Sequence, residues 1–266
     1  CILPDTWYSC AYNCTLKAVR FAMATYKAPL RDMQFVMQDL LNIEKHYQSL
    51  PDCDEVNQEL IDAILGEASK FSEEVVAPLN AVGDEVGCQL VDDGEVRTPP
   101  GFREAYQQYV EGGWPSLEQP TEYGGQGLPH FVGSVVSEMV GTANWSWGMY
   151  PGLSHGAINT LEVHGTDEQK KTYLKNMYTG VWGGTMLLTE PEAGSDVGNL
   201  STTAVRNPDG TFSLTGNKIF ITNGEHDLVD NIIHPVLARI EGDPAGTKGI
   251  SIFIVPKYFV NEDGSL

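Results

Sequence analysis

A short segment from Met186 to Asp196 holds the residues best suited to ligand chemistry. It reads M-L-L-T-E-P-E-A-G-S-D, an apolar stretch followed by a proline and a turn of small residues. Gly194 can take a positive φ or let the backbone approach a ligand closely, while Ser195 and Asp196 carry short side chains that bond neighbouring amides. Such a turn can cradle an anion or a cofactor, although a lone G-S-D is more often an ordinary turn after a strand.

A second segment, from Gly216 to Glu225, reads G-N-K-I-F-I-T-N-G-E. It places an aromatic residue, Phe220, and a threonine, Thr222, near the end of an apolar stretch. Taken one at a time, aromatic and β-branched residues of this kind are ordinary strand residues. Their joint spacing to the first segment favours a shared binding site.

Together the two segments resemble the flavin-binding middle domain of the acyl-CoA dehydrogenase family, whose signature is close to T-E-P-x-A-G-S-D followed by K-x-W/F-I-T-N. Every position from Thr189 to Asp196 agrees, with Glu192 at the variable site. The connector Y-G-G-Q-G that begins at Tyr123 and the stretch H-G-T-D-E-Q-K-K-T-Y-L that begins at His164 are similar to the family's helical domain. The resemblance covers essentially Met23 to Leu266.

The resemblance implies that this chain binds FAD. An isoalloxazine ring needs an apolar or aromatic wall on one face and hydrogen-bond donors near N5 and O4. Phe220 could cover that face and the hydroxyls of Thr189 and Thr222 could donate, while Ser195 would also approach the CoA part of the substrate. Many family members carry an aromatic residue at the position of Met186 and tryptophan at that of Phe220, but both substitutions keep an apolar surface. The residues implied to contact FAD are Met186, Leu187, Leu188, Thr189, Gly194, Ser195, Phe220, Ile221 and Thr222.

Four acidic residues lie in or beside these segments, but none is expected to be the catalytic base. Dehydrogenation of an acyl thioester needs a carboxylate to remove the α-proton while the β-hydride leaves for flavin N5. A carboxylate on a tight turn is more often a local hydrogen-bond acceptor, which is the role expected of Glu190, Glu192, Asp196 and Glu225. In the family the base is a glutamate of a carboxy-terminal helical domain. We expect the chain, which ends at Leu266, to be truncated before that domain and to be inactive by itself.

The resemblance also implies partners and a substrate class. Family members act on acyl-CoA thioesters, pass electrons to an electron-transfer flavoprotein, and form homo-oligomers that bind FAD partly through a neighbouring subunit. The stretch N-I-I-H-P-V-L-A-R-I, from Asn231, is especially similar to a longer bacterial branch that includes enzymes for methylmercaptopropanoyl-CoA and fatty acyl-CoAs. Two other functions are compatible with the sequence. The chain could belong to an oxidase or monooxygenase on the same fold, or to a non-catalytic relative that binds flavin or acyl-CoA.

The patterning of apolar residues predicts an α+β chain. Apolar residues recur every three or four positions from Leu30 to about Asn80, where Pro78 is expected to end the helical run. The period changes to that of strands at Trp182. We therefore expect a disordered or mis-annotated leader over 1–22, an all-α domain over 23–181, and an antiparallel β-sandwich or barrel-like middle domain over 182–266. The expected strands are 185–188, 201–205, 212–214, 218–222, 232–240 and 250–255.

Composition narrows the class of protein further. A formal net charge of −20 and a pI near 4.5 argue against nucleic acid or an anionic membrane as the main partner. The five cysteines show no metal-ligand spacing, and we interpret them as free thiols of a reducing compartment. No run is long and apolar enough to span a bilayer, so we expect a cytoplasmic protein. The histidines also lack paired metal spacing and are interpreted as structural or surface residues: His155, His164, His226 and His234.

Overall fold

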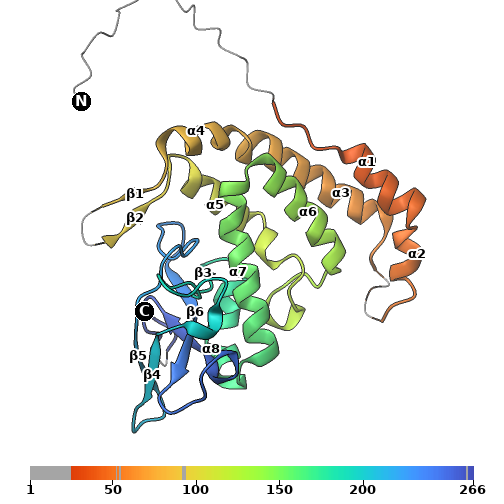
Figure 1. The fold of residues 1–266 in the computed structure, drawn as a ribbon. Coiled ribbons are helices and arrows are strands. Elements are labelled where there is room, and N and C mark those ends of the chain that lie inside the picture. Colours follow the sequence, from red (N-terminus) through yellow and green to blue (C-terminus); the bar gives the residue numbers. More distant parts are fainter. Residues whose placement is uncertain (1–24, 52, 54, 92–93, 262) are drawn as a thin grey trace, which may run out of the picture.

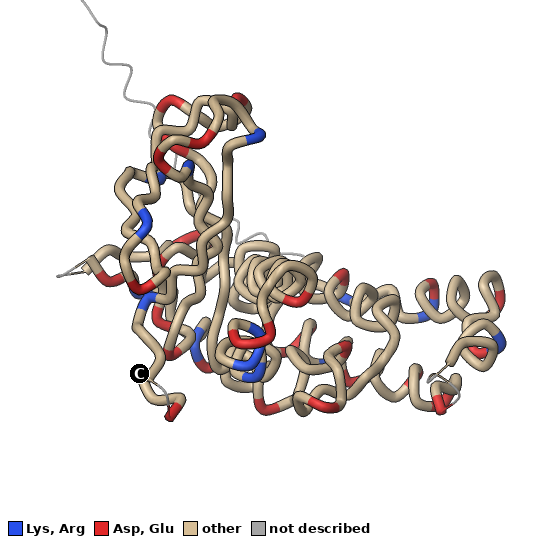
Figure 2. The backbone as a smooth tube through the Cα atoms, turned by 90° about the horizontal axis from the view of Figure 1, so that it is seen from below, with Lys and Arg blue, Asp and Glu red and all other residues tan. Residues whose placement is uncertain are grey.

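A helical part and a β part follow one another along the chain (Figure 1, and Figure 2 in a view from below). The computed structural model describes residues 25–51, 53, 55–91, 94–261 and 263–266. The leader expected over 1–22 therefore lies outside the described residues. Helix α8 (Asp167–Tyr178) is the last long helix before the sheet, and strand β3 (Trp182–Gly184) begins the sheet directly after it. The helical amino-terminal region and β middle region expected from the sequence are confirmed.

The helical part packs around helices α6 (His130–Ala143) and α7 (Trp145–His164). The side chain of Trp147 is fully buried, and its indole N–H donates to the carbonyl of Phe102 at 3.2 Å. Thr166 and Gln169 form the reciprocal capping box that begins α8, as their spacing predicts. The other elements are α1 (Leu30–Gln34), the π-helix η1 (Phe35–Leu40), α2 (Ile43–Tyr47), α3 (Gln58–Lys70), the π-helix η2 (Phe71–Val76), α4 (Pro78–Val86), a hairpin of β1 (Gln89–Leu90) and β2 (Val96–Arg97), α5 (Phe102–Glu111), and the short 3-10 helices η4 (Trp114–Ser116) and η5 (Thr121–Tyr123).

Pro78 does not end the helical run. It occupies the first turn of α4, which continues the chain of helices beyond η2. A proline is tolerated there because the N–H that it lacks has no partner within a helix at that position. The expectation that the helical run stops at Pro78 is therefore wrong.

Five strands form a mixed sheet around β6 (Asn231–Ile240). Strand β6 pairs in parallel with β3 and with β4 (Thr203–Arg206), and antiparallel with β7 (Ile250–Pro256). Strand β5 (Phe212–Thr215) pairs antiparallel with β4. The expectation that all pairs are antiparallel is wrong, because the long segments between β3 and β4 and between β5 and β6 supply the connections that parallel pairs require.

A proline inside β6 explains why the strand expected over 185–188 is interrupted. Thr185 donates its N–H to the carbonyl of Ile233, and Leu187 donates to that of Pro235. A regular parallel ladder would place an N–H of residue 235 on the carbonyl of Thr185, but proline has none. Only a bridge between Leu187 and Val236 follows. The prediction of a strand over 218–222 is also wrong, because these residues form no regular secondary structure.

The buried cap of α7 gives a first testable prediction. The Asn144 side chain accepts the N–H of Trp147 at 3.1 Å and donates to the carbonyl of Val76 at 3.5 Å. Asn144→Ala should lower the free energy of unfolding by about 1 to 2 kcal/mol, because a cap bond is lost at a buried site. Chemical denaturation measures this change. Asn57→Ala removes a similar but exposed cap from α3 and is the matched control; an equal or larger loss in this control would contradict the prediction.

Candidate functional site

The segment from Met186 to Asp196 belongs to a loop whose two ends both pair with the same edge of β6. Before the loop, Leu187 donates to Pro235 and accepts from Leu237. After it, the carbonyl of Thr202 accepts from Arg239. Residues 235, 237 and 239 alternate with those that face the other edge, so these bonds lie along one side of the strand. Residues 188–201 therefore form an excursion with both ends fixed on β6.

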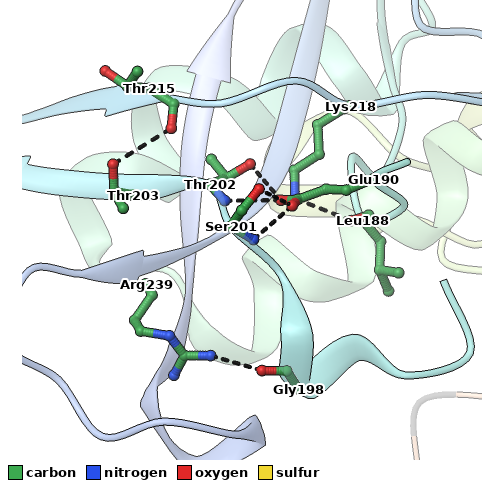
Figure 3. Close-up of polar contacts among 9 residues, drawn as sticks. All are labelled: Leu188, Glu190, Gly198, Ser201, Thr202, Thr203, Thr215, Lys218 and Arg239. Carbon is green, nitrogen blue, oxygen red and sulfur yellow. Dashed lines mark hydrogen bonds and ion pairs between the residues drawn. The ribbon is translucent and has the colours of Figure 1, made fainter. Parts of the chain in front are cut away.

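The carboxylate of Glu190 closes this loop at its base (Figure 3). It accepts the backbone N–H of Ser201 at 2.6 Å and that of Thr202 at 3.0 Å, and it also accepts both hydroxyls. The ammonium group of Lys218 completes the set at 2.8 Å from the same carboxylate. The side chains of Glu190 and Lys218 are 2% and 8% exposed, so this is a buried ion pair. Because Lys218 belongs to the second segment, the pair joins the two segments.

These partners also set the ionisation of Glu190. Burial alone would raise the pKa of its carboxyl, but the hydrogen bonds from Lys218, Thr202 and Ser201 outweigh burial and hold the pKa well below its ordinary value. A carboxylate with all these donors is an acceptor that holds the loop, as expected from the sequence. Asp196 likewise accepts from Asn199 at 2.6 Å.

Arg239 fixes the far side of the loop. Its guanidinium donates to the carbonyl of Gly198 at 3.0 Å (Figure 3). It also donates to the carbonyl of Gly246 at 2.9 Å and contacts that of Pro244. These carbonyls belong to the loop and to the connection between β6 and β7. The sequence did not single out Arg239, because an arginine inside a strand carries no local motif that marks such a role.

The residues expected to contact FAD lie on two adjacent segments. The carbonyl of Thr189 accepts the N–H of Ile219 at 2.9 Å, and the Thr185 hydroxyl donates to the carbonyl of Thr222 at 2.6 Å. The turn brings Gly194 close to Thr189, because a Cβ built on Gly194 would lie 3.5 Å from the methyl group of Thr189. The φ angle of Gly194 is not positive. Of the nine residues, those exposed are Met186, Gly194, Ser195, Phe220 and Thr222, and those partly buried are Leu187, Leu188, Thr189 and Ile221.

Phe220 is the most unusual of these residues. Its side chain is 88% exposed, and its φ is +56°, a region that bulky residues rarely occupy. Asn223 nearby has a φ of +58°, and its amide donates to the carbonyl of Met149 in α7 at 2.7 Å. An exposed aromatic ring on a strained but well-anchored backbone is typical of a position shaped by a ligand or a partner.

Two histidines hold the end of the second segment against the sheet and the helices. His226 is buried, and burial lowers the pKa of its imidazole to about 4. It accepts the N–H of Leu228 at 3.3 Å. His234 lies between the carbonyls of Gly224 and Val255, at 3.0 and 2.9 Å. These contacts agree with the structural roles expected for both histidines.

Removing the buried charge of Glu190 gives the second prediction. Glu190→Gln should lower the free energy of unfolding at neutral pH by about 3 to 5 kcal/mol, because it leaves Lys218 buried without its partner. The folded pKa of Glu190 lies below its ordinary value of 4.5, so its stabilisation is present above that value and is lost as the pH falls through the folded value. The difference between wild type and variant should therefore shrink below about pH 4.5. Denaturant titrations across pH measure it.

Glu192→Gln is the matched control, because Glu192 lies in the same loop but is exposed. Its free energy of unfolding should stay close to that of the wild type. Equal effects of the two substitutions, or a Glu190→Gln effect that does not change with pH, would contradict the role given to the ion pair.

Within the described residues, none of the helices has both the length and the apolar character that crossing a membrane requires. Comparison with known families gives two adjoining matches. Residues 58–181 match the model of the acyl-CoA dehydrogenase N-terminal domain, and residues 185–263 match that of the acyl-CoA dehydrogenase middle domain.

Known relatives agree with these matches. The chain is 45% identical over 240 residues to 3-methylmercaptopropionyl-CoA dehydrogenase of Ruegeria pomeroyi, covering 90% of this chain and 40% of that protein. An acyl-CoA dehydrogenase from Bacillus anthracis solved in complex with FAD has a TM-score of 0.59 and 27% identity, over 77% of this chain and 32% of that one. A chain in a structure described as the electron transferring flavoprotein of Acidaminococcus fermentans has a TM-score of 0.60 and 30% identity, over 77% and 49%. This chain spans less than half the length of each of these relatives, and it belongs to the acyl-CoA dehydrogenase family.

Proposed function

We propose that this chain forms part of the FAD site of an enzyme that oxidises the Cα–Cβ bond of an acyl-CoA thioester to the trans-2-enoyl-CoA. The observation that carries the proposal is the pairing of the two segments through Glu190 and Lys218, which presents the exposed ring of Phe220 beside the loop of small residues. Such a surface offers a flat apolar group next to a backbone that a ligand can approach.

The residues present fit the isoalloxazine ring of FAD. The ring of Phe220 and the partly exposed side chain of Met186 supply apolar surface. Thr222 is exposed and Thr189 is partly exposed, so their hydroxyls can serve as donors toward the polar edge of the ring. Gly194 and Ser195 are exposed in the turn and leave room for a ligand close to the backbone. Ser195 is the proposed contact to the CoA part of the substrate.

In the proposed reaction FAD supplies the acceptor for the hydride that leaves the β-carbon. The described residues bind and orient rather than move protons. Glu190 cannot serve as the base that removes the α-proton, because its carboxylate is buried and held by Ser201, Thr202 and Lys218. We place the base outside the described residues, in a carboxy-terminal helical domain. We infer that residues 23–266 alone neither turn over substrate nor bind FAD tightly.

The substrate and the partners of the whole protein are part of the same proposal. Its relative from Ruegeria pomeroyi is named for 3-methylmercaptopropionyl-CoA, which favours a short acyl-CoA with or without a thioether. We propose an electron-transfer flavoprotein as the electron acceptor, a homo-oligomeric assembly, and a cytoplasmic location. The relative named above is a dehydrogenase, which favours electron transfer to a protein over reaction of the flavin with oxygen.

The deciding experiment mixes the whole protein anaerobically with acyl-CoAs of different lengths, including 3-methylmercaptopropionyl-CoA, and follows the absorption of oxidised flavin. Bleaching by one class of thioester would establish the dehydrogenase half-reaction and identify the substrate class. Flavin that binds but stays oxidised with every thioester would favour a non-catalytic binding protein. Failure of the purified protein to bind FAD would refute the proposal.

Phe220 supplies the third prediction. Phe220→Ala should weaken FAD binding by the whole protein about five- to thirtyfold, since the loss of one aromatic contact in a ligand site removes roughly 1 to 2 kcal/mol. Fluorescence titration of the apoprotein with FAD measures the change. Phe259→Ala is the matched control, because that ring is 84% exposed but lies outside both segments. Equal affinities for the two variants would exclude Phe220 from the site.

A further inference from the structure

Three potential metal ligands converge in the helical part, on residues that belong to neither of the two segments. Glu118 lies in the loop before α6, His130 is the first residue of α6, and His155 lies on α7. One ligand atom from each lies within 4.8 Å of the other two. We propose that these side chains bind a divalent transition-metal ion such as Zn²⁺, at a site distinct from that of the proposed FAD.

Gly133 on α6 has no side chain, and this leaves room for the side chain of Glu118. A Cβ at Gly133 would lie 1.6 Å from the Oε1 atom of Glu118, which no alanine could accommodate without displacing the carboxylate. The Glu118 side chain is only 17% exposed, whereas that of His130 is 74% exposed. The carboxylate therefore lies against the helix, while His130 lies at the surface.

Among the residues that the structure describes, the ion-pair partner of the Glu118 carboxylate is an imidazole and not a lysine or an arginine. The Nδ1 atom of His130 contacts the Glu118 carboxylate directly. The rings of His130 and His155 lie with centroids 5.8 Å apart and planes 19° apart. Among the described residues that line the adjoining cavity, none is a lysine or an arginine. A largely buried carboxylate is stabilised by a cation or by metal coordination, and a divalent ion here would supply that positive charge.

The geometry leaves an open coordination position. All three side chains line a cavity of about 480 Å³ between α6 and α7. Two imidazoles and one carboxylate are the ligand set of catalytic zinc sites and of facial iron sites, in which a remaining position takes water or a ligand. Bonds of about 2.0 to 2.2 Å require the three donors to lie roughly 3.3 Å apart in a tetrahedron. The donors here lie within 4.8 Å of one another, so metal binding requires small movements of these side chains that bring the donors closer.

The test uses the whole protein, produced without a polyhistidine tag and stripped with a chelator. Co²⁺ is added while the visible d–d absorption is followed, and Zn²⁺ is then used to displace it. We expect one equivalent of Co²⁺ to give an intense tetrahedral or five-coordinate spectrum. Glu118→Gln and His155→Ala should each weaken binding by at least the roughly ten- to hundredfold that the loss of an outer-shell partner causes.

The controls separate this site from unspecific binding and from unfolding. His164→Ala removes an exposed histidine from the end of the same helix α7 and should leave the affinity unchanged. Glu118→Gln keeps the shape of the side chain, and circular dichroism with FAD titration checks that the variant folds. Binding that is absent, weaker than millimolar, or equally strong in Glu118→Gln, His155→Ala and His164→Ala would overturn the proposal and leave only a hydrogen bond between Glu118 and His130.

Discussion

The buried pair of Glu190 and Lys218 is the interaction on which the arrangement of the candidate flavin site depends. Each partner stabilises the charge of the other. The carboxylate also accepts the backbone N–H groups of Ser201 and Thr202, where the loop ends. A single carboxylate thereby fixes the span of the loop and the position of the second segment. Buried pairs of this kind contribute little net stability but strongly penalise the loss of one partner, so they favour one arrangement over others.

The sequence predicted the parts of the site that local chemistry determines. The two segments, the helical part before them and the cap at Thr166 follow from motifs and from the spacing of apolar residues. The sequence also predicted that Glu190 accepts hydrogen bonds, because a carboxylate in a turn lies close to backbone donors. These features need only residues near one another in the chain.

The parts that the sequence did not predict depend on contacts between distant residues. The gap in the ladder at Thr185 arises from Pro235 on another strand, and the parallel pairs of β6 arise from long connections. Glu118 and His155 are well separated in the chain, so their approach has no spacing pattern. Lys218 matches the lysine of the family signature, but its pairing with Glu190, 28 residues earlier, depends on the fold.

Both ends of the loop that carries Gly194 and Ser195 are held on one edge of β6. Its movements therefore follow those of the sheet, and a small rotation of the helices against the sheet would leave the relation between the loop and β6 intact. The second segment is held on both sides, by Lys218 to the loop and by Asn223 to α7. Phe220 lies between these two attachments, so the position of its ring depends on the sheet and on the helices together.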